Sequence, residues 1–249
     1  MNILVCVSRV PDTASRINIA SDGKSYDKTG IKFIVNPYDE FALEEGLRLR
    51  EKNGGTVTAL VVGGEQAVEN LRTALAMGVD KAVLVKADAE GRDSYYVAEN
   101  IAAYAREINP DIILMGRQSV DFDSLQMPAL VGEALGMPSV SVVAKLTIDG
   151  TKVTAERDIE GGKETVETTL PCIISAQKGL NDPRYPKLPD IMKAKSKPIE
   201  QREAVAADSR VETIKMEIPS KSRAGKILGD SDADIDELVR ILHEEAKVI

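Results

Sequence analysis

A polar loop that begins Gly116-Arg117-Gln118-Ser119 follows an apolar run and opens into an expected helix. Backbone N–H groups at the start of a helix bind anions, and phosphate is the common ligand of such a site. Asp121 and Asp123 oppose this interpretation, because their carboxylates repel a phosphate unless they turn aside to cap the helix. Since neither GxGxxG nor a P-loop sequence is present, the loop alone leaves nucleotide binding and simple helix capping as equal alternatives.

Catalysis by side chains is not predicted. The single histidine, His243, lies beside Glu244 and Glu245 in an expected C-terminal helix, where a solvated surface position is its ordinary role. The sequence has no Ser-His-Asp set, CxxC pair or metal-ligand cluster. Its two cysteines, Cys6 and Cys172, lie in apolar runs and are expected to be buried reduced thiols, as in a cytoplasmic protein.

A run of basic residues stands out in a chain whose net charge is −8. Its members are Arg184, Lys187, Lys193, Lys195 and Lys197. Leu188, Ile191 and Met192 lie among these charges, and exposed apolar residues in a basic setting indicate a surface that docks a protein. A solvated extended segment is the alternative. Nucleic acid is not expected as a partner, because the chain as a whole is acidic.

An alternation of strands and helices is expected to position these segments. Apolar runs that predict strands lie at Asn2–Val7, Val57–Val62, Lys81–Val85 and Asp111–Met115. Helical spacing of apolar residues lies between them, and the first helix is expected to begin at Asn36-Pro37. The predicted fold class is therefore α/β: a parallel-sheet nucleotide-binding fold with helices on both faces, whose ligands bind beyond the carboxyl ends of the strands.

The pattern changes after Pro138. Adjacent strands are expected at Ser139–Leu146, Lys152–Arg157 and Glu164–Thr169, joined by glycine-containing turns, and Ile173–Ala176 is a further short strand. We predict one domain over residues 1–178 that includes this antiparallel extension.

Residues 179–249 contain little that could form a core. Gly179–Pro198 holds four prolines and is expected to be extended, and the polar remainder ends in a short helix over Asp234–Lys247. A segment so poor in apolar residues does not offset its own conformational entropy by folding alone. We predict that it is an arm that lies on an obligate partner. No apolar run is long enough to span a bilayer, so the chain is not expected to be membrane-embedded.

Several motifs along the chain are specific enough to indicate a family. The longest are Glu156–Gly162, Leu170-Pro171, Gly179–Tyr185 and Leu188–Lys195, and shorter ones are Val35–Tyr38, Arg72–Gly78 and Gly116–Gln118. Together these motifs resemble those of electron transfer flavoprotein β subunits. The likeness extends to about residue 200 and then fades into a generic tail.

This resemblance implies a heterodimer with an α subunit that holds most of the redox-active FAD. The β subunit supplies one wall of the FAD site and an AMP site of its own, and its arm wraps the α subunit. Electrons pass from acyl-CoA and related dehydrogenases of fatty acid β-oxidation to the FAD, and then to a membrane quinone oxidoreductase. The chain would accordingly be an electron carrier subunit and not an enzyme.

The resemblance also assigns residues to the two sites. The positions that match the AMP site are Cys6, Asn36, Pro37, Tyr38, Asp39, Val62, Gly116, Arg117, Gln118, Ser119, Val120, Asp121, Phe122, Asp123, Ser124, Leu125, Gln126 and Met127. The positions that match the dehydrogenase-docking loop are Arg184, Tyr185, Leu188, Pro189, Ile191, Met192 and Lys193, with Leu188 as the anchoring leucine.

Two departures from the family pattern leave the nucleotide open. AMP-binding members have a threonine where this chain has Met127, and a tyrosine near the flavin where it has Val10–Thr13. The latter string and Gly91–Ser94 are more similar to electron-bifurcating members, which hold a second FAD in place of AMP, but Phe122 and Leu125–Met127 depart from that pattern too. AMP is the preferred prediction and a second FAD the alternative. A non-redox nucleotide-binding sensor or interaction protein is a further alternative, because many functions share this fold.

Overall fold

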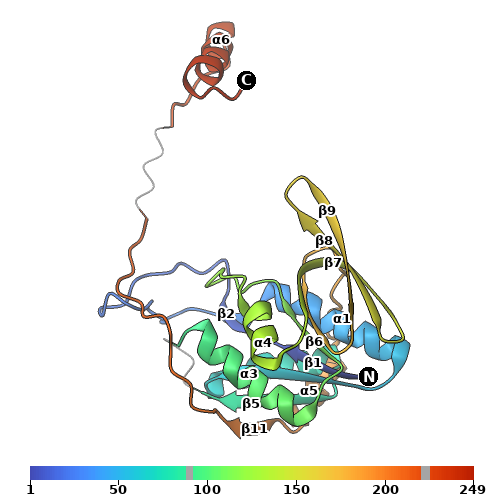
Figure 1. The fold of residues 1–249 in the computed structure, drawn as a ribbon. Helices are drawn as coiled ribbons and strands as arrows, with labels where there is room; N and C mark the ends of the chain where they lie inside the picture. Colours follow the sequence, from blue (N-terminus) through green and yellow to red (C-terminus); the bar gives the residue numbers. More distant parts are fainter. Residues whose placement is uncertain (88–91, 220–224) are drawn as a thin grey trace. The chain divides into compact units, whose positions relative to one another are not determined.

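The computed structural model describes residues 1–87, 92–219 and 225–249 (Figure 1). Within these residues the chain forms two compact units, Met1–Met216 and Glu217–Ile249. The first unit contains the sheet and both sets of residues that the sequence assigns to sites.

The described part of the first unit is built on a nine-stranded sheet in the order β11-β5-β4-β1-β6-β10-β7-β8-β9. The strands are β1 Asn2–Cys6, β4 Thr56–Gly63, β5 Lys81–Lys86, β6 Ile112–Gly116, β7 Ser139–Asp149, β8 Lys152–Ile159, β9 Gly162–Thr169, β10 Cys172–Ala176 and β11 Glu200–Glu203. Strands β11 through β7 in this order are parallel, and β7, β8 and β9 are antiparallel. The predicted α/β class and the antiparallel extension are confirmed.

Helices cover both faces of the sheet (Figure 1). They are α1 Pro37–Asn53, α2 Val68–Met77 (after a 3₁₀ turn, Glu65–Ala67), α3 Ser94–Ile108, α4 Met127–Leu135 and α5 Leu188–Ser196. Alternate residues of β1 point to opposite faces. Ile3 and Val5 therefore pack in one core with α1 and α2, while Leu4 and Cys6 pack in the other with α3 and α4.

The sequence predicts one helix that starts near Asp123-Ser124 and another that is capped by Ser94, and the structure differs from both predictions. The helix α4 begins at Met127, not near Asp123-Ser124, because Asp123 and Leu125 have φ angles of 54° and 53°, which do not continue into a right-handed helix. Asp93, not Ser94, caps α3, since its carboxylate accepts a hydrogen bond from the N–H of Tyr96 at 3.0 Å.

The stretch Gly179–Pro198 was expected to be extended, and this is wrong for its second half. The helix α5 forms there, with Pro189 in its first turn, where a missing N–H has no intrahelical partner to lose. It packs on α2 and buries Ala194. Two short antiparallel strands, β2 Arg9–Pro11 and β3 Phe33–Val35, were also not predicted.

Residues 199–211, here called the strap, continue from α5 along the edge of the sheet. Its strand β11 pairs with β5. The buried side chain of Asn100 on α3 accepts a hydrogen bond from the N–H of Val205 at 2.8 Å and donates one to its carbonyl at 3.3 Å. Asp93 accepts a further bond from the N–H of Val211 at 2.9 Å. The strap is thus hydrogen-bonded to its own domain.

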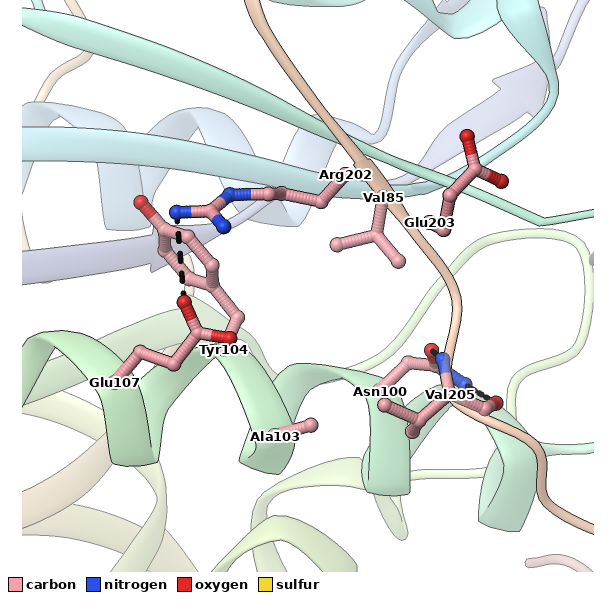
Figure 2. A pocket seen from close by; sticks show the side chains of 8 residues that line it. All are labelled: Val85, Asn100, Ala103, Tyr104, Glu107, Arg202, Glu203 and Val205. Carbon is pink, nitrogen blue, oxygen red and sulfur yellow. Dashed lines mark hydrogen bonds and ion pairs between the residues drawn. The ribbon is translucent and has the colours of Figure 1, made fainter.

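A cavity of about 150 Å³ lies between the strap and α3 (Figure 2). Figure 2 shows the Asn100–Val205 bonds at one end and the ion pair between Arg202 and Glu107 at the other, where the charged atoms are 3.4 Å apart. The described residues that line this cavity include none of those assigned to the nucleotide.

The second unit contains α6, Asp232–Arg240, followed by a π-helical turn, Ile241–Glu245. Ser231 and Asp234 form a capping box at its start, close to the helix predicted over Asp234–Lys247. The helix buries none of its residues, and Ile235, Leu238 and Val239 are exposed. In the described parts of both units, every helix is too short or too polar to cross a membrane.

Candidate functional site

Asp39 joins three elements at the carboxyl edge of the sheet. It lies in the first turn of α1 and is only 3% exposed. One carboxylate oxygen accepts a hydrogen bond from the N–H of Ser8 at 2.7 Å, and the other accepts from the N–H of Gly116 at 2.9 Å. Ser8 follows β1 and Gly116 ends β6, its parallel neighbour. A single side chain therefore connects the ends of two strands to the start of α1.

The electrostatics of this position follow from its burial. Burial raises the pKa of Asp39 to about 7, although the hydrogen bonds from Ser8, Asn36 and Gly116 act in the opposite direction. Burial, and then the charge of Asp39, also raise the pKa of the Cys6 thiol. A thiol with a raised pKa stays protonated and is a poor nucleophile. Cys6 is therefore a packing residue beside the site.

Gly116 is required at its position by the close approach of α1. A Cβ atom there would lie 2.4 Å from an Asp39 carboxylate oxygen and 2.7 Å from the backbone of Tyr38. Any other residue would have to displace the first turn of α1, which includes Pro37 and Tyr38.

Asn36 fixes the loop that follows β6. Its side chain is fully buried, donates to the carbonyl of Gln118 at 2.8 Å and accepts from the N–H of Val120 at 3.2 Å. It occupies the N-cap position of α1, but its side chain makes no capping bond to the backbone N–H groups of that helix. The two ends of the candidate site, 36–39 and 116–120, are thus held together by side-chain to backbone hydrogen bonds.

The acidic residues of the loop turn to local donors. Asp121 accepts from the N–H of Phe122 at 3.0 Å, and Asp123 accepts from the side-chain amide of Gln118. Neither caps α4, whose N-cap is Gln126. Across the described residues, the exposed backbone N–H groups of Ser124, Leu125 and Gln126 donate to no protein acceptor.

The remaining assigned residues surround this arrangement. The Arg117 guanidinium lies 5.2 Å from the centre of the Tyr38 ring and donates to the side chain of Gln118 at 2.5 Å. Val62 is the penultimate residue of β4, whose carboxyl end adjoins that of β1. Ser119 lies within the loop, and Met127 begins α4.

Two residues beside the site were not among those assigned to it from the sequence. Ser8 supplies one of the N–H groups bound by Asp39. Arg9, in β2, stacks on Phe33 of β3, with its guanidinium 3.5 Å from the ring centre, and its buried Nε has no partner among the described residues. The apolar run Phe33-Ile34-Val35, directly before the Asn36 cap, was the signal for β3.

The assigned docking residues occupy the chain before α5 and its first turns; residues 184–193 are here called the docking segment. Tyr185 is 93% exposed, Leu188 is 73% exposed and Met192 is 58% exposed. Ile191, Pro189 and Lys193 are exposed too. Arg184 differs from the rest, because it forms ion pairs with Glu44 and Glu51 of α1. The segment therefore presents apolar side chains that its own domain leaves uncovered.

Comparison with known proteins identifies the family. Residues 24–207 match the family described as Electron transfer flavoprotein domain. The chain is 44% identical over its full length to the full-length Electron transfer flavoprotein subunit beta of Bacillus subtilis. It is 38% identical over both full lengths to the mitochondrial protein of that name from Oryza sativa subsp. japonica, and 37% identical to the mouse protein, with 90% of this chain and 91% of the relative covered. From these matches along its length, the chain belongs to the electron transfer flavoprotein family as a β subunit.

Proposed function

We propose that this β subunit binds AMP at the edge of the sheet formed around Asp39. The observation that carries the proposal is the set of hydrogen bonds between residues 36–39 and 116–120. These bonds hold the start of the loop after β6 at the carboxyl ends of β1, β4 and β6. Further along the same loop, the N–H groups of 124–126 have no acceptor among the described residues. Ligands of open parallel sheets bind at this edge.

The residues present suit a phosphate. The N–H groups of Ser124, Leu125 and Gln126 have no acceptor among the residues that the structure describes, as at other helix starts that bind anions. The carboxylates of Asp121 and Asp123 are engaged by local donors, which keeps their oxygens hydrogen-bonded within the loop. Arg117 adds a positive charge beside Tyr38.

The subunit acts, in this proposal, as one half of a heterodimer with an electron transfer flavoprotein α subunit. FAD, shared with that subunit, supplies the redox chemistry when bound. The exposed apolar residues of the second unit, including Ile235 and Leu238, support an arm that packs on the α subunit. The β chain orders the nucleotide and the docking segment, and supplies no catalytic side chain.

The docking segment binds the protein that donates the electrons, which then pass to the FAD. The exposed Leu188 and Met192 lie among Lys187 and Lys193, a surface suited to an apolar pocket with an acidic rim on an acyl-CoA or related dehydrogenase. A membrane quinone oxidoreductase accepts the electrons. We place the pair in the cytoplasm, which agrees with two buried free cysteines.

A second FAD in place of AMP is the alternative. It is favoured by the string Val10–Thr13, which stands where AMP-binding members have a tyrosine near the flavin. The related string Gly91–Ser94 contributes less, since residue 91 lies outside the described residues and Asp93 serves as the cap of α3.

The test is to identify the nucleotides released from the purified heterodimer by mass spectrometry. One FAD and one AMP for each heterodimer is the expected result. Two FAD and no AMP would replace the proposal by the alternative, and one FAD with no further nucleotide would contradict both.

A further inference from the structure

The first end of the docking segment is attached to α1 through Arg184. Its Nε and Nη2 donate to the two carboxylate oxygens of Glu44 at 2.8 and 3.0 Å, and its own backbone N–H donates to Glu44 at 3.1 Å. Its Nη1 also reaches Glu51 at 2.6 Å. Two parallel bonds between a guanidinium and a carboxylate fix orientation as well as distance.

The acidic partner of Arg184 is an unusual residue for the inner side of a helix. The Glu44 side chain is only 4% exposed. Burial raises its pKa, but hydrogen bonds from Arg184 and Arg48 outweigh burial and leave the pKa below its ordinary value. Asn181, just before the segment, is also buried and donates to the carbonyl of Phe41 and to Glu45, both at 3.0 Å. The segment therefore starts from a fixed point on α1.

The far end of the segment is attached to α2 through Arg72. Its guanidinium donates to the carbonyl of Ala194 at 2.6 Å and to the carbonyl of Lys197. The last carbonyls of a helix lack intrahelical partners, so Arg72 satisfies the C-terminal end of α5. Ala194 is buried against the core, and Lys197 donates to the carbonyl of Val79 at 3.3 Å.

We propose that Arg72 and Arg184 are positioning residues that hold the docking segment in its binding geometry before a donor protein arrives. Between these two fixed ends, the side chains of Tyr185, Leu188 and Met192 are exposed. Ordering a loop on binding reduces affinity, and a segment ordered in advance avoids that loss. The inference rests on the proposed docking function, in which the partner is an acyl-CoA-type dehydrogenase.

The test uses the αβ heterodimer with Arg184→Met and Arg72→Met. A purified acyl-CoA dehydrogenase, reduced with its acyl-CoA substrate, is the donor. We expect the KM for the donor to rise about tenfold in each variant, with kcat and flavin reduction by dithionite unchanged. Amide hydrogen exchange over residues 188–196 should accelerate in both variants. Arg184→Lys keeps the positive charge but not the paired bonds, so it should also raise KM and accelerate the exchange. This variant keeps the inference testable if Arg184→Met does not fold.

Matched controls are present in the chain. Arg48→Met removes another arginine bound to Glu44, at 2.9 Å, and Arg106→Met removes one that donates to the carbonyl of Ala134 near the end of α4 at 2.5 Å. Both should leave KM and the exchange of 188–196 at wild-type values.

Two outcomes would overturn the inference. The first is unchanged amide hydrogen exchange over residues 188–196 in folded Arg72 and Arg184 variants. The second is accelerated exchange with a wild-type KM for the donor, provided that Leu188→Ala still slows reduction. A failure of the proposed docking function gives a different result. In that case the donor would reduce Leu188→Ala at the wild-type rate, whether or not amide exchange of the segment changes.

Discussion

The backbone N–H of Gly116 and the carboxylate of Asp39, 77 residues apart in the sequence, are joined by a hydrogen bond of 2.9 Å. The contact places the end of β6 against the first turn of α1 with no room for a Cβ atom between them. The same carboxylate binds the N–H of Ser8 after β1, so Asp39 links the ends of β1 and β6 at the edge of the sheet where the nucleotide is proposed to bind.

Asp39→Asn should change how stability depends on pH. The folded pKa of about 7 exceeds the ordinary value of 3.8, so between these values the native state holds a proton that the unfolded chain has lost. The free energy of unfolding therefore falls as pH rises from about 4 to 7, by at most about 1.4 kcal/mol per pH unit from this group. Asparagine does not titrate, so its curve should be flatter in that window.

The measurement is urea unfolding of the heterodimer from pH 4.5 to 8 at fixed protein concentration. Asp80→Asn is the control, because Asp80 also accepts a backbone N–H, from Val57 at 2.8 Å, at the opposite end of the strands. Parallel curves for wild type and Asp39→Asn would show that Asp39 does not titrate in this range.

Gly116→Ala should release the nucleotide and destabilise the fold. The added Cβ would overlap Asp39 and Tyr38, and overpacking of this kind typically costs about 1–3 kcal/mol. Gly63→Ala is the matched control at the same edge of the sheet, since its Cβ would meet only ordinary contacts at 3.7 Å. Nucleotide content and the midpoint of thermal unfolding measure the two effects. Equal behaviour of the two variants would exclude the steric role of Gly116.

Gln126→Pro tests the backbone donors of the loop. Proline removes the N–H of residue 126, whose φ of −95° is nearer to the range of proline than the 53° of Leu125. We expect loss of the released AMP in mass spectrometry, while Gln126→Ala, which keeps the N–H, retains it. Full AMP in the proline variant would mean that this N–H does not bind the phosphate.

Leu188→Ala should slow reduction by a donor dehydrogenase severely, because a central apolar anchor commonly contributes about 2 kcal/mol or more to binding. Reduction by dithionite and FAD content should not change. The lysines around Leu188 should matter differently: Lys187→Ala should lower the association rate at low salt and lose its effect as salt screens the charge. Stopped-flow reduction against ionic strength distinguishes the two contributions, and a variant equal to wild type at every salt concentration would make residue 188 irrelevant to docking.

Limited proteolysis of the β chain alone should remove the second unit and leave a fragment that ends near Met216. The helix α6 buries none of its residues, whereas Asn100 and Asp93 bind the strap as far as Val211. Asn100→Ala should move the protected end back toward Ala204, because both bonds to Val205 are lost. Mass spectrometry of the fragments locates the ends, and an unchanged end in the variant would show that the strap is held without Asn100.

Local patterns in the sequence determined most of the architecture. Apolar runs specified the strands β1, β4, β5 and β6, and Asn36-Pro37 marked the start of α1, because these signals act over a few residues. The motifs around Arg157 and Leu188 indicated the family, which the full-length relatives confirmed.

Only the tertiary structure decided which distant residues meet. The sequence marked Asp39 as an acid in a first helical turn, and marked Arg184 as one member of a basic run. The packing of α1 on β6 placed Asp39 against Gly116, and the return of the chain after β10 brought Arg184 to Glu44. The helix α5 formed in a proline-rich stretch because α2 covered Ala194 and Arg72 bound its last carbonyls. Such contacts depend on how elements fit together in space, and no short-range propensity contains that information.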